Sequence, residues 1–236
     1  MTPQSVPVLV EVCVDSLEGA LVAEQAGAHR LELNFALELD GLTPSPGLVK
    51  AVLDQVNIPV IAMVRPRSGD FCYRTHEWQT MVRSAAWLLD AGVAGLAFGA
   101  VTPDGTVEPQ RCREMRNMAA ERELVFHKAF DVLADWSLSV EQLTDAGIDR
   151  VMTSGRADGC LDGLQAMQNL HQETRGRLSI LPAGGISAAN VAKVVRAVGV
   201  EQIHGSFSAG NPRDYTAIAA EIRSTLKNLQ FHFNQQ

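Results

Sequence analysis

The sequence has few cysteines, no excess of positive charge and no long apolar run. Its four cysteines, Cys13, Cys72, Cys112 and Cys160, lie far apart and form no C-x-x-C pair, which excludes a disulfide framework and a zinc knuckle. The formal net charge of -7 excludes the basic surface that attracts nucleic acid or an anionic membrane. The N-terminal MTPQSVPVLVEV carries no basic start, and no segment approaches the ~18 apolar residues of a membrane span. We therefore expect a cytoplasmic protein with neither nucleic acid nor membrane as a partner.

Short aliphatic runs recur along the chain, and each is followed by a segment with helix-like amphipathic spacing. The eight runs are Val8 to Val14, Arg30 to Phe35, Ile58 to Val64, Gly95 to Phe98, Leu124 to Lys128, Arg150 to Thr153, Leu178 to Leu181, and Gln202 to His204. Eight strand and helix units of about 30 residues each are typical of a closed parallel barrel. The sequence predicts a single (β/α)8 TIM-type barrel over residues 1–236. A doubly wound open sheet is the alternative, but its glycine fingerprint is missing after the first run.

The loops of the predicted barrel fall into two kinds. Glycine-bearing turns such as AGVAG and AGIDR end the helical segments just before the next strand. The opposite loops, LELDGLTPSPG, RPRSGDFCYRTHE and GAVTPDGTVEP, are longer and richer in charge, glycine and proline. These follow the carboxyl ends of the strands, where barrels of this type carry their chemistry.

Two glutamates are predicted to point into the barrel. The first two strands contain V-E-V-C and L-E-L-N, and a period of two places Glu11, Cys13, Glu32 and Asn34 on the face opposite the valines and leucines. A carboxylate buried there without a partner would cost several kcal/mol, so it must meet a cation. The two glutamates are either structural ion-paired residues or part of a functional site.

The third strand runs into R-P-R-S-G-D-F, which supplies the candidate cations. Arg65 and Arg67 share one face, and Asp70 follows in the loop. Their guanidinium groups could neutralise the two glutamates, or they could bind a carboxylate or phosphate of a ligand in bidentate fashion. The sequence favours both readings equally.

The fifth and sixth strands add polar side chains to the same rim. In F-H-K-A-F-D, alternation places His127 and Asp131 on one side near the carboxyl end of the strand, where they are candidates for proton transfer or ligand anchoring. The V-M-T-S-G segment offers Ser154, which is either a ligand contact or a helix cap. A lone histidine also often has only a structural role.

The last two strands end in glycine-bearing segments. In many barrels the loops after strands seven and eight hold a phosphate through backbone N–H groups, and Gly184, Gly185, Gly205 and Ser206 lie where such a cradle would be. His204 shares a face with Ser206 on strand eight. Glycine after a strand is equally common as plain turn chemistry.

Six motifs of this chain resemble those of the CutC copper-homeostasis family and occur in the same order, from about Val8 to Ser208. They are E-V-C, R-L-E-L, D-G-L-T-P-S, R-P-R-S-G-D-F-C-Y, F-H-K-A-F-D and V-M-T-S-G. The resemblance implies a cytoplasmic TIM-type barrel linked to copper tolerance that forms a homodimer or a higher homo-oligomer. The polar pocket it implies comprises Glu11, Glu32, Arg65, Arg67, Asp70, His127 and Asp131.

The resemblance also implies a copper(I) thiolate ligand at Cys13. This chain departs from the family pattern at the end of strand two, where Asn34 stands in place of a common cysteine. One soft ligand therefore remains where two would suit copper(I). His127, His204 or the thioethers of Met63 and Met152 are the candidates to complete the site.

Two functions from different classes remain open, together with a non-catalytic scaffold. The first is a copper-binding protein that uses Cys13. The second is an enzyme that acts on a small anionic or phosphorylated metabolite, with Glu11, Glu32, His127 and Asp131 as the candidate catalytic residues. Carboxylates beside a histidine serve several reaction classes, so the sequence does not select one.

Overall fold

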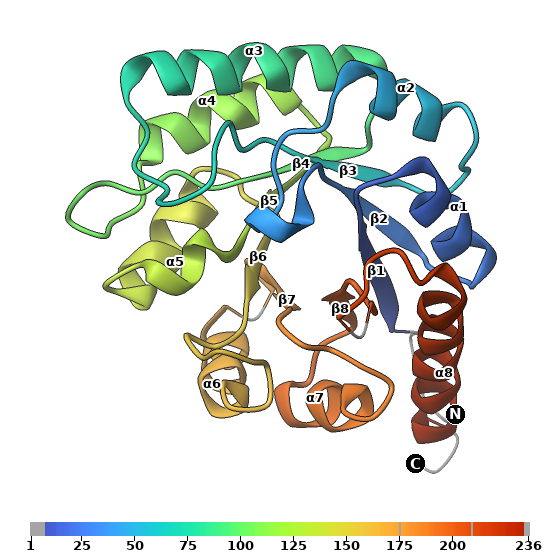
Figure 1. The fold of residues 1–236 in the computed structure, drawn as a ribbon. Coiled ribbons are helices and arrows are strands. Elements are labelled where there is room, and N and C mark those ends of the chain that lie inside the picture. The colour runs from blue at the N-terminus through green and yellow to red at the C-terminus, as the bar shows by residue number, and fades with distance from the viewer. Residues whose placement is uncertain (1–7, 175, 209, 234–236) are drawn as a thin grey trace.

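A computed structural model describes residues 8–174, 176–208 and 210–233 of the chain. Eight parallel strands form one sheet in the order β7-β6-β5-β4-β3-β2-β1-β8, and the helices surround them (Figure 1). The strands are β1 (Leu9–Val14), β2 (Arg30–Leu33), β3 (Val60–Met63), β4 (Gly95–Phe98), β5 (Glu123–Phe126), β6 (Arg150–Thr153), β7 (Ser179–Pro182) and β8 (Gln202–Gly205). The TIM-type (β/α)8 barrel predicted from the sequence is confirmed.

The helices alternate with the strands along the chain. They are α1 (Leu17–Gln25), α2 (Pro46–Leu53), α3 (Thr75–Ala91), α4 (Pro109–Ala119), α5 (Trp136–Asp145), α6 (Leu164–Thr174), α7 (Val191–Val198) and α8 (Tyr215–Phe233). Two short 3-10 helices, η1 (Leu37–Leu39) and η2 (Lys128–Val132), lie in the loops after β2 and β5. Neighbouring strands follow chain order from β1 to β7, and β1 also pairs with β8, so the alternative of a doubly wound open sheet, in which the strand order reverses midway, is wrong. Among the described residues, no helix combines the length and the apolar composition that a membrane span requires.

Local sequence signals explain where the helices begin and end. Ser16 precedes α1 and its hydroxyl accepts a hydrogen bond from the backbone N–H of Gly19 at 3.1 Å, which satisfies one of the free donors of the first turn. Ser45 does the same before α2, whose first residue is Pro46. Helix α3 ends at Gly92, which has a φ of 103°, a conformation that a side chain would disfavour.

Three predicted strands run past the carboxyl ends of the observed ones. Strand β2 ends at Leu33 rather than Phe35, β3 occupies only Val60–Met63, and β5 ends at Phe126 rather than Lys128. In each case the chain leaves the extended conformation early, because a loop with its own hydrogen bonds begins there. Phe35, for example, pairs with Leu42 in a short antiparallel bridge.

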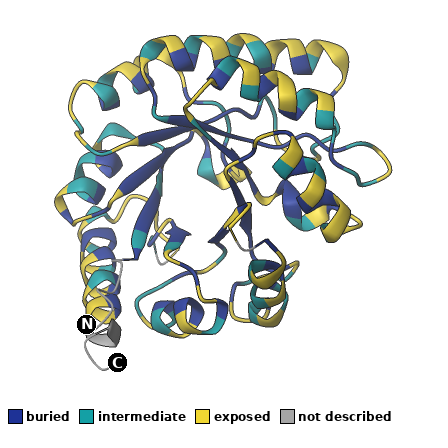
Figure 2. Cartoon of the chain, turned by 180° about the vertical axis from the view of Figure 1, so that it is seen from behind, coloured by how far each residue is buried: buried dark blue, intermediate teal, exposed yellow. Residues whose placement is uncertain are grey.

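The barrel has an apolar layer outside its strands and a mixed layer inside. Outward residues such as Val10, Val12 and Leu31 are fully buried in the large cluster between strands and helices, and the strands are dark blue in Figure 2 because they are buried on both faces. A smaller apolar cluster lies inside the barrel and consists of Ile61, Met63, Ala97, Val125, Met152, Leu181 and Ala183. The polar side chains of β1, β2 and β8 complete the interior together with Arg150 of β6, which pairs with Glu123 of β5 at 2.6 Å.

Candidate functional site

A cavity of about 400 Å³ lies at the carboxyl ends of the strands. Its lining side chains come from the ends of β1, β2, β3, β5, β6 and β8 and from the loops after them. This volume and location are typical of a small-molecule or metal site in a barrel of this type.

Glu11 lies inside the barrel below this cavity, with 1% of its surface exposed. One carboxylate oxygen, Oε2, accepts a hydrogen bond from Arg30 Nε, and the other, Oε1, lies 2.8 Å from His204 Nδ1. Arg30 is itself 4% exposed and donates a further hydrogen bond to Gln202 at 3.0 Å. Glu11 is therefore the centre of a buried charged network that joins β1, β2 and β8.

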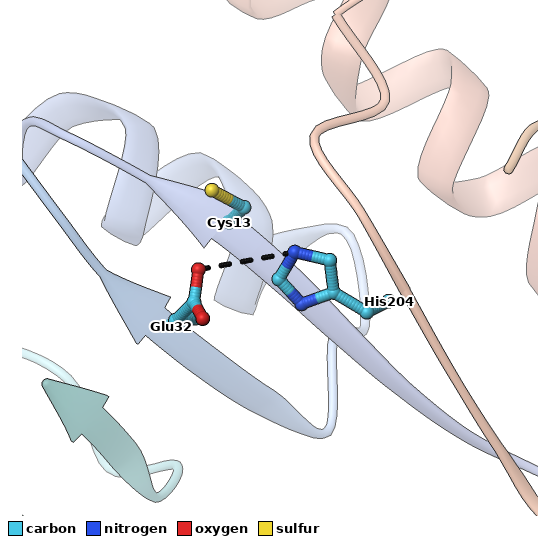
Figure 3. A group of neighbouring side chains, drawn as sticks. All are labelled: Cys13, Glu32 and His204. Carbon is cyan, nitrogen blue, oxygen red and sulfur yellow. Dashed lines mark ion pairs between the residues drawn. The ribbon is translucent and has the colours of Figure 1, made fainter. Parts of the chain in front are cut away.

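Glu32 lies above this network and lines the cavity. Its Oε2 atom accepts a hydrogen bond from Asn34 Nδ2 at 2.8 Å and is 3.8 Å from His204 Nε2. Asn34 Nδ2 also lies 3.3 Å from the Cys13 sulfur. Figure 3 shows Cys13, Glu32 and His204 facing one another, and one donor atom of each lies within 4.8 Å of the others. The sequence predictions that both glutamates point inward and that Cys13 and Asn34 share their face are thus correct.

The charges of this cluster are interdependent. Burial would raise the pKa of Glu11, but the hydrogen bond with His204 and the charge of Arg30 outweigh it and lower that pKa to about 2. Burial would lower the pKa of His204, but the charge of Glu32 and the hydrogen bond to Glu11 raise it above its usual value. At neutral pH, Glu11 is therefore ionised, and its Oε1 atom accepts a hydrogen bond from the Nδ1–H group of His204.

The two groups nearest the cavity respond differently to burial. Burial raises the pKa of Glu32, although the charge of His204 opposes the shift. Burial and the charge of Glu32 raise the pKa of the Cys13 thiol well above its usual range. Cys13 therefore keeps its proton at neutral pH unless a metal ion displaces it.

Arg65 is buried at the cavity wall, but it does not neutralise either glutamate, and that prediction is wrong. Its Nη1 atom donates to the carbonyl oxygens of Leu39, Asp40 and Gly41 at 3.1, 3.0 and 3.3 Å, and its Nη2 atom donates to Gly69 at 3.0 Å. The guanidinium group thus holds two loops together. The partner of Glu11 is Arg30, because Arg30 is the register neighbour of Glu11 on β2 and shares the inward face of the barrel with it.

Arg67 and Asp70 lie outside the cavity, so the prediction that Arg67 converges with the glutamates is also wrong. Arg67 forms ion pairs with Glu77 and with Asp70, the latter at 3.0 Å. The Asp70 side chain is 69% exposed. These residues fix the loop after β3 to the start of α3, since beyond Met63 the chain no longer alternates as a strand does.

His127 lies at the cavity wall and is 4% exposed. Its Nδ1 atom accepts a hydrogen bond from the backbone N–H of Ala129 at 3.1 Å, which begins the 3-10 helix η2. Burial and the charge of Arg65 lower the pKa of His127 to about 3. The ring is therefore neutral, and because Nδ1 is an acceptor, its proton is on Nε2.

Asp131 and Ser154 both line the cavity and contact each other. Asp131 lies in η2 rather than on an extended strand, so the predicted alternation with His127 is wrong beyond Phe126. Its Oδ2 atom accepts hydrogen bonds from the backbone N–H and the hydroxyl of Ser154, both at 3.0 Å. Asp131 therefore fixes the loop after β6, and a catalytic role for it stays a prediction.

Gly184, Gly185 and Ser206 are not among the residues that line the cavity. Gly184 and Gly185 have φ angles of 93° and 71°, and the carbonyl oxygen of Gly184 accepts a hydrogen bond from Cys160 at 2.8 Å. The Ser206 hydroxyl is exposed beside Ser208. Turn geometry accounts for both glycines, and the phosphate cradle stays a prediction.

Two features of the site were missed by sequence reasoning. Arg30 begins the R-L-E-L segment, and the same alternation that points Glu32 inward also points Arg30 inward, so the signal was present. Glu32 was not named among the possible metal ligands, although His204 was a candidate to join Cys13; the grouping of all three depends on the packing of β8 against β1, which no local spacing in the sequence reveals.

Comparison with known proteins agrees with this geometry. The family model described as CutC family matches residues 8–209. The chain belongs to the CutC family. A family protein CutC of Treponema denticola is 41% identical over 195 residues, which cover 83% of this chain and 79% of that protein. The copper homeostasis protein cutC homolog of Homo sapiens is 38% identical over 206 residues, which cover 87% of this chain and 75% of that protein.

A solved structure of the CutC family supports the fold in the same way. The crystal structure of CutC from Streptococcus agalactiae is 28% identical, has a TM-score of 0.80, and covers 84% of this chain and 98% of its own. The family resemblance and the barrel expected from it are therefore confirmed. The names of the relatives connect the CutC family with copper homeostasis.

Proposed function

We propose that this CutC-family chain is a cytoplasmic copper-homeostasis protein that binds one copper(I) ion through the Cys13 thiolate and His204 Nε2, with Glu32 beside them. The proposal rests on the mutual distances of the three donor atoms, which lie within 4.8 Å of one another at the cavity. The copper-homeostasis names of the human and mouse relatives support the choice of metal.

Two of the three donors, the Cys13 thiolate and the His204 imidazole, suit copper(I). Thiolate is the soft ligand that copper(I) prefers, and imidazole also suits copper, whereas the carboxylate of Glu32 is a harder donor. The hydrogen bond of 2.8 Å between Glu11 and His204 Nδ1 orients the ring so that Nε2 faces Cys13 and Glu32, as carboxylates behind metal-binding histidines do.

Asn34 gives the proposal a gain-of-function test. Its side-chain nitrogen lies 3.3 Å from the Cys13 sulfur, so an Asn34→Cys substitution would place a second thiolate beside the first. We expect this variant to bind copper(I) at least about tenfold more tightly than the wild type, because a second soft ligand replaces a hydrogen-bond donor.

The experiment is an anaerobic copper(I) titration against a competing chelator, with the wild type, Cys13→Ser, His204→Gln and Asn34→Cys. Cys72→Ser is the matched control, since Cys72 is half-buried in a loop away from the cluster. The proposal requires one bound ion in the wild type, loss of affinity in Cys13→Ser and no change in Cys72→Ser. Equal affinity of the wild type and Cys13→Ser would contradict it.

We also propose that the chain forms a homodimer or a higher homo-oligomer. Phe35 and Val132, which are 55% and 57% exposed, are large apolar side chains on loops at the carboxyl ends of the strands, and a second copy would cover such surface. Light scattering after size-exclusion chromatography measures the mass in solution. A mass of one 25.5 kDa chain at micromolar concentration would contradict this proposal.

The second candidate function is an enzyme that acts on a small anionic metabolite. One observation favours it: the cavity extends beyond the three metal-ligand candidates to a wall that carries Arg65 and His127. A metal ion would fill only a small part of about 400 Å³.

A further inference from the structure

The wall that carries Arg65 and His127 contains two buried N–H donors that have no hydrogen-bond partner within the described part of the chain. The side chains of these two residues both pack against Phe71: the Arg65 guanidinium carbon and the centroid of the His127 ring each lie 5.0 Å from the centroid of the Phe71 ring. All three residues line the cavity. They are separate from Cys13, Glu32 and His204, which come from β1, β2 and β8.

His127 presents a free donor. Its Nδ1 atom accepts from Ala129 at 3.1 Å, so the proton of the neutral ring is on Nε2. Within residues 8–174, 176–208 and 210–233, Nε2 has no hydrogen-bond partner although it is buried. An unsatisfied buried donor costs about 1–3 kcal/mol, and such atoms in native proteins usually have a partner.

Arg65 presents a second free donor together with an uncompensated charge. The residue is 3% exposed, its Nη atoms donate hydrogen bonds to neutral carbonyl oxygens, and the buried Tyr73 hydroxyl, another neutral group, also interacts with it. Its Nε atom has no partner, and no carboxylate forms an ion pair with it, among the parts of the chain that are described. A buried cation without a counter-ion is costly, and a bound anion would remove that cost.

We propose that this wall binds an oxyanion group of a small organic molecule, a carboxylate or a phosphate, whose oxygens accept hydrogen bonds from His127 Nε2 and Arg65 Nε. The rest of the molecule extends into the cavity toward Glu32. Lys128, which lines the same cavity and is exposed, adds a positive charge near the opening. The inference goes beyond copper binding and does not depend on it.

Two substitutions of His127 separate the role of its two nitrogens. Asparagine places an acceptor where Nδ1 is and is a favourable residue before a helix, but it cannot reach the Nε2 position. Glutamine places an amide N–H near the Nε2 position. We expect His127→Asn to weaken anion binding about tenfold or more, the effect of losing one hydrogen bond to a charged group, and His127→Gln to weaken it much less.

The experiment is isothermal titration of metal-free protein, dialysed free of chelator, with malonate, inorganic phosphate and the neutral malonamide. Malonate or phosphate should bind and malonamide should not, and the stronger of the two anions identifies the carboxylate or the phosphate as the group recognised. Arg67→Gln is the control for general surface charge, because Arg67 lies outside the cavity, and it should bind like the wild type. Urea unfolding verifies that each variant is folded.

Three results would overturn the proposal: no anion binds more tightly than malonamide, His127→Asn binds as the wild type does, or Arg67→Gln loses as much affinity as His127→Asn. Cys13→Ser separates this proposal from the copper site. It should bind the anion unchanged while losing copper, whereas joint loss of both would place the anion at the metal cluster and contradict the separate wall.

Discussion

The replacement of Arg30 by methionine tests the buried network most sharply. The substitution leaves Glu11, which is 1% exposed, without its guanidinium partner. Removal of one member of a buried ion pair costs about 3–5 kcal/mol. The variant can limit this cost by protonating Glu11 on folding. Because the ordinary pKa of this carboxyl is 4.5, protonation at pH 7 costs about 3 kcal/mol.

We therefore expect Arg30→Met to lower the free energy of unfolding by about 3 kcal/mol at pH 7, and the melting temperature by roughly 6–12 °C for a chain of this size. At pH 5 the loss should fall below about 1 kcal/mol, because protonation of a carboxyl is then cheap. Urea unfolding at the two pH values measures both effects.

Arg67→Met is the matched control for this prediction. Arg67 also pairs with carboxylates, but its side chain is 34% exposed, and ion pairs at the surface contribute about 0–1 kcal/mol. If Arg30→Met cost no more than Arg67→Met at pH 7, the network would not be the buried ion pair described here. A double variant Arg30→Met with Glu11→Gln should recover part of the lost stability, since it leaves no buried charge on β1.

Three further predictions concern the loops and the cavity wall. Gly41→Ala should destabilise the protein by more than about 2 kcal/mol in urea unfolding, because Gly41 has a φ of 81° and an added Cβ would lie 2.3 Å from the Asn34 side-chain oxygen. Gly47→Ala is the control and should be neutral or stabilising in the same assay, since nothing lies within 4 Å of an added Cβ there. Arg65→Met should increase proteolytic cleavage within residues 36–42, since that loop loses three hydrogen bonds, and an unchanged cleavage rate would contradict the assignment. The pKa of His127 falls from 6.5 to about 3 on folding, so below pH 6.5 the unfolded state binds a proton that the folded state does not. Between pH 7 and pH 5 the wild type should therefore lose about 2 kcal/mol more stability than His127→Asn. Parallel losses in the two proteins would refute a buried neutral ring.

The sequence predicted the parts of the site that lie within regular strands. The alternation in V-E-V-C and L-E-L-N placed Glu11, Cys13 and Glu32 on the inward face, because side chains of a strand alternate wherever the strand continues, and Asn34, the first residue after β2, keeps the same side. The barrel itself followed from the recurrence of strand and helix units.

Predictions failed where a side chain lies beyond the end of its strand. Arg65 follows β3 and Asp131 follows β5, and loop geometry, rather than alternation, directs both. Arg65 contacts carbonyl oxygens of a loop that is distant in sequence, which no local pattern encodes. His204 meets Glu11 only because β8 pairs with β1, a long-range contact that depends on closure of the barrel.

X-ray absorption at the copper K-edge of the copper(I)-loaded wild type tests the proposed copper site. We expect one sulfur ligand, from Cys13, together with nitrogen or oxygen ligands from His204 and Glu32, which are the donors that lie within 4.8 Å of one another. The sulfur contribution should disappear in Cys13→Ser and double in Asn34→Cys. Two sulfur ligands in the wild type, or a sulfur ligand that persists in Cys13→Ser, would contradict the assignment of the site.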